Sequence, residues 1–448
     1  MTTTQHPFIA RPHRTLLALM FPVLLSLVAE PITGLVDTAF IAQLEETEPL
    51  AALGVATTAL SSMFWVFNFL TVGTQTQISQ AAGAGKSTNT QRLTSLALMV
   101  AWGLSIVVMI VFMPLAGGVS ALLGAEGTVR EASTAYIRIR LMGTPAVFTM
   151  LVCFGVMRGA QDMRMPSMIA VAQNVFNIIL DYPFIFGIGD MIPGMGVAGA
   201  ALASALSQYI GAAWALTVTL RRYGFTPQAD IDGLRDLFQI GGNLFLRTSF
   251  LMLFMIVSTR VANIAGSESG AAHQVIRQIY VVTALSLDAF AVSTQSLVGY
   301  FLGAGDRRHA RQAAIISIWW SLGTGTALAI IMVVVTAPLV ALMVPDEAVA
   351  IFIPAWIISA IAQPINALSF STDGIHMGSS DYAFLRNAMF ISTVGGIIAL
   401  LLIQTEAFHA LSYVWLATTL WVGLRAIAGM ARIYIPEFNA PLAPTTQN

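Results

Sequence analysis

A few polar side chains that could take part in proton transfer or binding lie inside long apolar stretches of this 448-residue chain. Two sets share the spacing i, i+3 and i+7, which gives a narrow polar stripe on a helix: Glu30, Thr33, Asp37 and Asn174, Asn177, Asp181. Neither stripe contains a basic residue. Burial and the proximity of other acids favour the protonated form of a carboxyl group, so proton uptake near neutral pH becomes possible. We interpret the two stripes as sides of one cavity; a structural polar cluster between helices is the alternative.

Two further acids, Asp288 and Asp373, lie inside apolar stretches of the second half. The first apolar stretch of that half carries Arg247 and Arg260 instead of an acid, and the next carries Arg277. Charged groups at membrane depth are costly and need a partner or a cavity. Pairing of either acid with Arg247 or Arg277 is one interpretation, and a role in the passage of substrate or ions is the other.

Two prolines share the predicted helix that carries Asp37. Pro22 stands in its first half, and Pro31 directly follows Glu30. Proline removes a backbone hydrogen bond, so this helix can bend or kink. A bending helix with a titratable carboxyl group is a plausible coupling device, and a static kink is the alternative.

Several other motifs do not support a known chemistry. The sequence GAGKST at 83–88 ends like a phosphate loop, but Gln80 stands where such a loop needs glycine. The six histidines lack metal-ligand spacing, and His376 fits a polar interior residue. GAGD at 303–306 occurs in a basic loop, unlike the same motif of intramembrane aspartyl proteases. We expect no enzymatic activity, no metal, no nucleotide and no cofactor.

The composition indicates how these residues are positioned. The chain is 56% hydrophobic and 10% charged, whereas soluble domains carry roughly 25% charged residues. The formal net charge of −1 gives no basic surface for nucleic acid. Apolar runs of this length exclude a transmembrane barrel and predict helices that cross a bilayer. Twelve spans fit, at 16–42, 51–80, 95–122, 131–157, 166–188, 197–219, 237–264, 271–301, 312–343, 348–377, 384–404 and 408–432.

The short loops predict the orientation of these spans. Arg and Lys gather in alternate loops, on the side that also holds Arg11 and Arg14 before the first span. The other side holds Arg130 and is acidic, with Glu45, Glu46 and Asp190 among its residues. By the positive-inside rule, both termini are cytoplasmic, and we expect a multi-pass protein of the inner membrane.

The sequence also repeats itself. Gly155, Gly159 and Asp162 recur as Gly374, Gly378 and Asp381, and 381 − 162 gives an offset of 219. The repeat predicts an all-α membrane protein of two six-helix bundles related by an axis along the membrane normal. We expect an N-lobe over 1–220, a cytoplasmic linker over 221–235, a C-lobe over 236–434 and a cytoplasmic tail over 435–448.

Several stretches resemble the multidrug and toxic compound extrusion (MATE) family, most closely its DNA-damage-inducible F (DinF) branch. The matching stretches, in chain order, are LVDTAFIAQL, RGAQDMRMP, NIILDYPF, LFLRTSF, SLDAFAVSTQSLVGYFLGAGD and DGIHMGSSDYAFLRNAM. The resemblance covers nearly the whole chain and implies two six-helix lobes around a central cleft of alternating access. Family members export amphipathic, often cationic drugs in exchange for protons or sodium.

The resemblance also implies roles for single residues. It matches Asp37, Asn177 and Asp181 to the proton-coupling site, and Pro22 to the bend of the first helix. Positions of the N-lobe cavity are matched by Glu30, Thr33, Asn174 and Tyr136. Glu30 and Thr33 depart in residue type from some relatives, which leaves the charge preference for substrate open. The acid that another branch carries on its seventh helix for sodium is absent here.

The sequence therefore predicts a monomeric secondary transporter that exchanges protons for amphipathic drugs or organic cations across the bilayer. Sodium coupling and a lipid-linked precursor flippase of the same superfamily remain alternatives. The flippase would need a strongly cationic cavity, whereas these stripes are acidic. A major-facilitator carrier also has twelve spans, but the loop GAGKSTNTQR does not match its basic loop after the second span.

Overall fold

The computed structural model describes residues 6–44, 47–189, 191, 193–226, 231–435 and 442, without the side chains of residues 231 and 232. Its described elements are helices, with no β-strand among them, as the sequence predicts. Glu45, Glu46 and Asp190 of the predicted acidic side lie outside the described residues. So does the predicted tail, except for residues 435 and 442.

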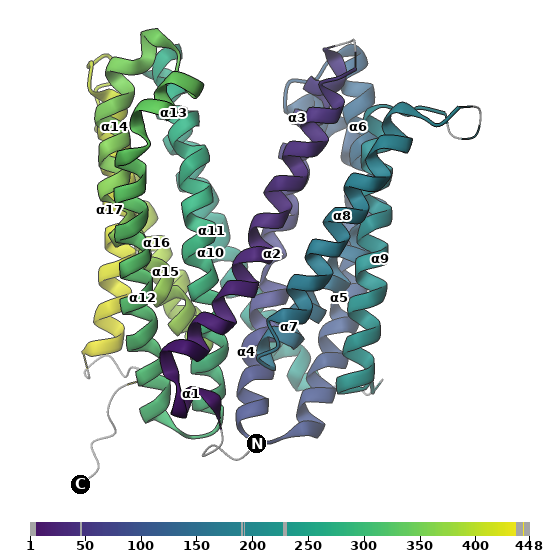
Figure 1. Cartoon of the computed structure of the whole chain (residues 1–448), viewed down its shortest axis with the longest axis vertical. Coiled ribbons are helices and arrows are strands. Elements are labelled where there is room, and N and C mark those ends of the chain that lie inside the picture. The colour runs from purple at the N-terminus through teal and green to yellow at the C-terminus, as the bar shows by residue number, and fades with distance from the viewer. Residues whose placement is uncertain are drawn as a thin grey trace. The chain divides into compact units, whose positions relative to one another are not determined.

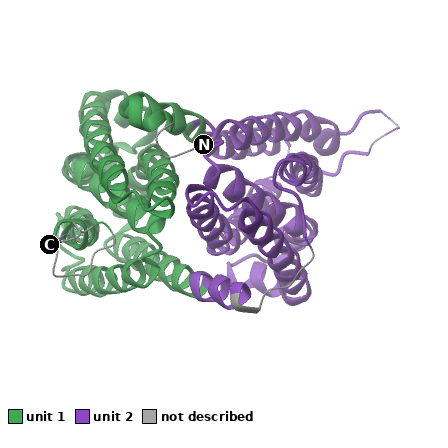
Figure 2. Cartoon of the chain, turned by 90° about the horizontal axis from the view of Figure 1, so that it is seen from below, with its two compact units in different colours: residues 1–24, 242–448 green, residues 25–241 purple. Residues whose placement is uncertain are grey.

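The chain divides into two compact units, each with its own hydrophobic core (Figure 2). Unit 2 is Leu25–Gly241, and unit 1 combines Met1–Leu24 with Gly242–Asn448. The helices of unit 2 are the end of α2 (Pro12–Ile41), α3 (Glu48–Val66), α4 (Phe69–Gly83), α5 (Ser87–Leu122), α6 (Gly127–Met142), α7 (Thr144–Gly159), α8 (Arg164–Phe186), α9 (Val197–Tyr223) and the start of α10 (Ile231–Ile264) (Figure 1). The helices of unit 1 are α1 (Pro7–Ala10), the start of α2, the end of α10, α11 (Ser267–Gly303), α12 (Arg307–Val334), α13 (Thr336–Met343), α14 (Val349–Ile361), α15 (Gln363–Gly378), α16 (Tyr382–Leu401) and α17 (Ala410–Tyr434).

Ten helices of the described chain are long and apolar enough to cross a membrane, and two bent helix pairs raise that number to twelve. In one pair, α6 and α7 are bent by 49°. In the other, the segment that ends with α14 is bent by 44° against α15. Pro145 and Pro364 stand in the first turn after each break, where proline is tolerated because its missing N–H has no helical partner. Each pair covers one predicted span, 131–157 or 348–377, so the twelve spans agree with the sequence.

The unit boundaries differ from the predicted lobes. The predicted linker over 221–235 is mostly helical, because α9 continues to Tyr223 and α10 begins at Ile231; residues 227–230 lie outside the described residues. The chain passes from unit 2 to unit 1 within α10, between Gly241 and Gly242. It passes from unit 1 to unit 2 within α2, between Leu24 and Leu25.

The first 24 residues belong to unit 1 and not to the predicted N-lobe. Phe8 is fully buried, and its ring lies 5.5 Å from that of Phe301 at the end of α11. Trp320 of α12 donates a hydrogen bond from Nε1 to Nδ1 of His13, at 3.0 Å. These ring contacts explain why the N-terminal segment joins the second half of the chain.

The internal repeat is a repeated contact between helices. In unit 2, a Cβ atom at Gly155 or Gly159 of α7 would lie 2.7 or 2.6 Å from a carbonyl oxygen of α4. In unit 1, one at Gly374 or Gly378 of α15 would lie 2.3 or 2.6 Å from a carbonyl oxygen of α11. No larger residue fits such an approach, so glycine is required at all four positions.

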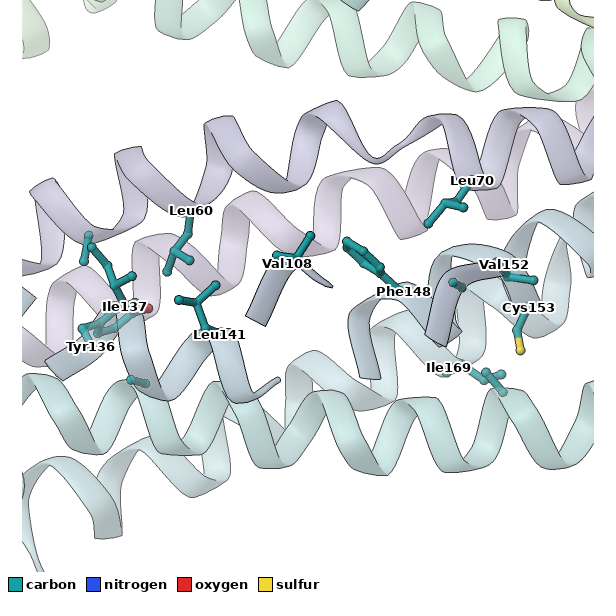
Figure 3. Packing of buried hydrophobic residues seen from close by; sticks show 14 of the residues in the cluster. Leu60, Leu70, Val108, Tyr136, Ile137, Leu141, Phe148, Val152, Cys153 and Ile169 are labelled. Carbon is teal, nitrogen blue, oxygen red and sulfur yellow. The ribbon is translucent and has the colours of Figure 1, made fainter. Parts of the chain in front are cut away.

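Apolar side chains from several helices form the core of unit 2 (Figure 3). Leu60 of α3, Val108 of α5, Leu141 of α6 and Phe148 of α7 belong to this cluster. Tyr136 of α6 packs among them and is 3% exposed. The core therefore fixes α6, whose polar side chains enter the site described next.

Candidate functional site

Asp37 of α2 and Asp181 of α8 come together inside unit 2, with 8% and 0% of their surfaces exposed. Their carboxyl groups lie within hydrogen-bonding reach of each other. Asp37 Oδ1 and Asp181 Oδ2 are buried, and no donor among the described residues serves them. Ionised carboxylates only accept hydrogen bonds, so this contact needs a proton on one of the two groups. The geometry is that of a carboxyl pair sharing one proton.

Asn177 orients one member of this pair. Its side chain is 3% exposed, and Nδ2 donates to Asp181 Oδ1 at 3.3 Å, one helical turn along α8. The amide occupies one oxygen of Asp181 and leaves Oδ2 for the shared proton. The spacing of the stripe, noted in the sequence, is what places Asn177 there.

Two residues of α6 complete the cluster. The Tyr136 hydroxyl is hydrogen-bonded to Ser204 of α9, and the charges of both acids act on it. Arg140, four residues further along α6, lies close enough to Asp37 and Asp181 to act on both electrostatically. Its Nε and Nη1 atoms are buried without a hydrogen-bond partner in the described part of the chain. Tyr136 thus lies near the acid pair, and its role remains a prediction, whereas Arg140 was missed.

Not every residue of the two stripes reaches the acid pair. Thr33 is buried, but its hydroxyl donates to the carbonyl oxygen of Ala29 in its own helix, at 3.1 Å. Glu30 is exposed on α2, and Asn174 is half-buried one turn before Asn177. The structure therefore gathers the Asp37 end of one stripe and the Asp181 end of the other. The cavity roles of Glu30, Thr33 and Asn174 remain predictions.

Helix α2 is continuous through both of its prolines, Pro22 and Pro31. Pro22 stands two residues before the point where this helix leaves unit 1 at Leu24. Asp37 lies beyond that point, in unit 2. The same helix thus joins the acid cluster to a proline at the unit boundary.

Unit 1 contains a second ionised cluster. Asp373 Oδ2 accepts hydrogen bonds from Arg247 Nη2 at 2.5 Å and from Arg425 Nη2 at 2.6 Å. The pair of Asp373 with Arg247 is thus present, whereas Arg277 donates to Gln274 in its own helix at 3.1 Å. Arg425 was missed, because it belongs to the last span, 52 residues further along the chain than Asp373.

The remaining candidates give no further site. Asp288 is half-buried on α11, and its role remains a prediction. His376 is buried, with Nε2 3.1 Å from the carbonyl oxygen of Gly429, and is a polar interior residue as expected. Across the described ranges no group of three or more His, Cys, Asp and Glu side chains could hold a metal ion. The stretch at 83–88 follows helix α4 and not a strand, so it is not a phosphate loop.

Comparison with known proteins identifies the family. The MatE family model matches residues 22–183 and 244–424, which include the acid cluster and nearly all described spans. The chain belongs to the MATE family. It is therefore a multi-pass membrane transporter of a family that includes multidrug efflux proteins.

Relatives of this MATE-family chain come from plants and bacteria. It is 30% identical over 444 residues to Protein DETOXIFICATION 44, chloroplastic, of Arabidopsis thaliana, covering 95% of this chain and 83% of that protein. It is 26% identical over 437 residues to DNA damage-inducible protein F of Escherichia coli, covering 94% of this chain and 92% of that protein. The DinF-like resemblance noted in the sequence agrees with this second relative.

Solved structures support the MATE fold. A crystal structure of MATE in the bent conformation has a TM-score of 0.87 at 20% identity, covering 96% of this chain and 97% of that one. An outward-facing multidrug resistance MATE transporter of the MOP superfamily also scores 0.87 at 20% identity, with coverages of 95% and 96%. At this identity the likeness establishes the fold alone.

Proposed function

We propose that this chain is a proton-coupled multidrug exporter, which exchanges protons for amphipathic, often cationic compounds by alternating access. The observation that carries the proposal is the buried pair of Asp37 and Asp181, with Asn177 hydrogen-bonded to Asp181 and Arg140 close to both acids. Two bacterial relatives are named probable multidrug resistance protein NorM and multidrug resistance protein MdtK, which supports the substrate class. We further propose an inner-membrane location with both termini cytoplasmic, as the loop charges favour.

The charge of the cluster gives a direct reason for exchange. Asp37, Asp181 and Arg140 together carry one net negative charge when both acids are ionised, and none when one proton is shared. A cationic substrate is attracted only to the first form. Proton and substrate therefore compete for the same state, and reciprocal competition is sufficient for antiport.

The proposed mechanism uses helix α2 to transmit this change. Protons that enter from the outer side neutralise the pair, and the hydrogen bonds of Asp37 rearrange. Helix α2 then bends near Pro22, the N-lobe cavity lined by Glu30, Thr33 and Asn174 shrinks, and substrate leaves outward. The position of Pro22 near the unit boundary supports this assignment.

Drug efflux from membrane vesicles under an imposed pH gradient, with and without sodium, tests the proposal. The unmodified protein should drive efflux from the pH gradient alone, and Asp37→Asn should abolish that efflux while the protein still folds. Glu48→Gln, which replaces an exposed acid at the start of α3, is the matched control and should transport normally. Efflux that requires sodium would replace proton coupling by sodium coupling. Unchanged efflux in Asp37→Asn would refute the role of the acid pair.

A further inference from the structure

A small enclosed pocket lies in unit 1 between α15, α16 and α17, and the proposed function does not use it. Its volume of about 10 Å³ is the space of one water-sized molecule. Its lining includes Asp373 and His376 of α15, Phe384 and Met389 of α16, and Arg425 and Gly429 of α17. The pocket therefore opens directly onto the ionised cluster of this unit.

The cluster at this pocket carries more positive than negative charge. Asp373 is a single carboxylate bound by two guanidinium groups, those of Arg247 and Arg425. The neighbouring pair of Asp381 and Arg432, with Nε to Oδ2 at 2.9 Å, is neutral and does not offset the difference. Arginine stays protonated in proteins, so Asp373, Arg247 and Arg425 together carry one net positive charge.

This excess charge is buried and only partly stabilised. The side chain of Arg425 is 5% exposed and that of Arg247 is 12% exposed. The Trp421 ring lies 4.8 Å from the Arg425 guanidinium carbon, and a cation–π contact of this kind stabilises a cation only in part. A buried charge without an ionised partner is costly, so the site is suited to an additional negative group.

Unused hydrogen-bond donors point the same way. Asp373 Oδ2 occupies Nη2 of both arginines, which leaves the Nε edge of each. The Nε atoms of Arg425 and Arg247 are buried and have no hydrogen-bond partner among the described residues. Each such donor loses its hydration without compensation, and an acceptor in the pocket would restore the lost interaction of Arg425, which lines the pocket.

We infer that this pocket binds one compact monoanion, either chloride or the carboxylate group of a small organic acid, next to Arg425 and Arg247. Both ligands accept N–H hydrogen bonds and neutralise the excess charge of the cluster. Asp373 holds the two guanidinium groups together without neutralising both. The small volume of the pocket excludes a drug-sized molecule.

The sign of the charge predicts opposite effects of two substitutions. Arg425→Gln removes the excess charge and one donor, so the anion should bind at least tenfold more weakly. Asp373→Asn removes the competing carboxylate and leaves two positive charges, so the anion should bind at least tenfold more tightly. Arg260→Gln is the matched control, because Arg260 is exposed on α10. The anion affinity of this variant should equal that of the unmodified protein.

Thermal unfolding of the purified full-length protein measures this binding without transport. Sodium chloride or sodium acetate is titrated at constant sodium, with HEPES as a bulky balancing anion, and the rise in Tm gives the affinity.

A saturable rise in Tm with either salt that follows the predicted order of the variants supports the site. Acetate alone assigns a carboxylate ligand, and chloride alone assigns the inorganic ion. The site is refuted if Tm shows no saturable rise with either salt, or if Tm rises equally in Asp373→Asn and in the unmodified protein. If Arg425→Gln does not fold, the comparison of Asp373→Asn with the unmodified protein is sufficient to test the site. None of these outcomes depends on the Asp37 cluster.

Discussion

The charge of the acid cluster leads to a sharp prediction for substrate binding. Asp37→Asn leaves Asp181 and Arg140 as a neutral pair at every pH at which Asp181 is ionised. Adding Arg140→Gln to this variant restores one net negative charge and leaves no second carboxylate to share a proton. The single variant should therefore imitate the protonated cluster, and the double variant the ionised one.

The size of the effect follows from Coulomb's law. A substrate cation one helical turn from the cluster is about 6 Å away. One unit of charge at that distance, in a medium of effective dielectric constant about 20, is worth about 3 kcal/mol. That energy is about a hundredfold in affinity. A neutral compound of the same shape should lose almost none of its affinity.

Equilibrium binding of matched cationic and neutral compounds to the purified variants, measured across pH, checks this reasoning. The unmodified protein should bind the cation more tightly as pH rises and the shared proton leaves. Asp37→Asn should bind the cation weakly at every pH, and Asp37→Asn with Arg140→Gln should bind it tightly at each pH at which Asp181 is ionised. A double variant as weak as Asp37→Asn, or an equal loss for the neutral compound, would show that charge does not control binding here.

Three further predictions concern stability, and each is checked by thermal unfolding in detergent. Gly374→Ala should destabilise unit 1 by about 1–3 kcal/mol, because the new methyl group would meet a carbonyl oxygen at 2.3 Å, whereas Gly103→Ala, with nothing within 4 Å, should not. Lys86 and Asp306 are the N-cap residues of α5 and α12 and have nearly the same backbone conformation, but only the side chain of Asp306 makes a capping hydrogen bond. Lys86→Asp should therefore stabilise the protein by about 1 kcal/mol. Burial opposes ionisation of Asp306, but hydrogen bonds from the backbone N–H and ring of His309 outweigh it and keep the pKa of this carboxyl below its ordinary value. A lowered pKa stabilises the fold above the unfolded value of about 4, so Asp306→Asn should lower Tm at pH 7, and its difference from the unmodified protein should vanish as pH falls through the lowered pKa.

The spans were predictable because each depends on a long local run of apolar residues. Even the two bent pairs each correspond to a single predicted span, since Pro145 and Pro364 interrupt a helix without adding a polar segment. The pairing of Asp37 with Asp181 was also accessible, because two stripes of equal spacing can face one cavity. These features are encoded by neighbours along the chain.

The features that were missed depend on contacts between distant parts of the chain. Arg140 lies inside a predicted span, whereas the orientation of the spans depends on the cations of the loops. Its spacing of four residues from Tyr136 was the available signal. Arg425 reaches Asp373 across 52 residues, and nothing in the local sequence marks it as a partner. The assignment of the first 24 residues to unit 1 rests on ring contacts such as that of Phe8 with Phe301.

The repeated glycine contact has a consequence for how charge is distributed in this protein. With the offset of 219, Asp373 corresponds to Phe154, and Asp181 corresponds to Leu400. The last helices of the two halves align through Arg222 and Arg432, which pair with Asp162 and Asp381, and their offset of 210 places Ala215 opposite Arg425. Each half therefore carries ionised groups where its counterpart carries apolar ones, around the same glycine-bearing helices. The same duplicated fold therefore accommodates an acidic interior in one half and a basic interior in the other. Each half shows that the fold also forms with apolar residues at the positions where the other half is charged.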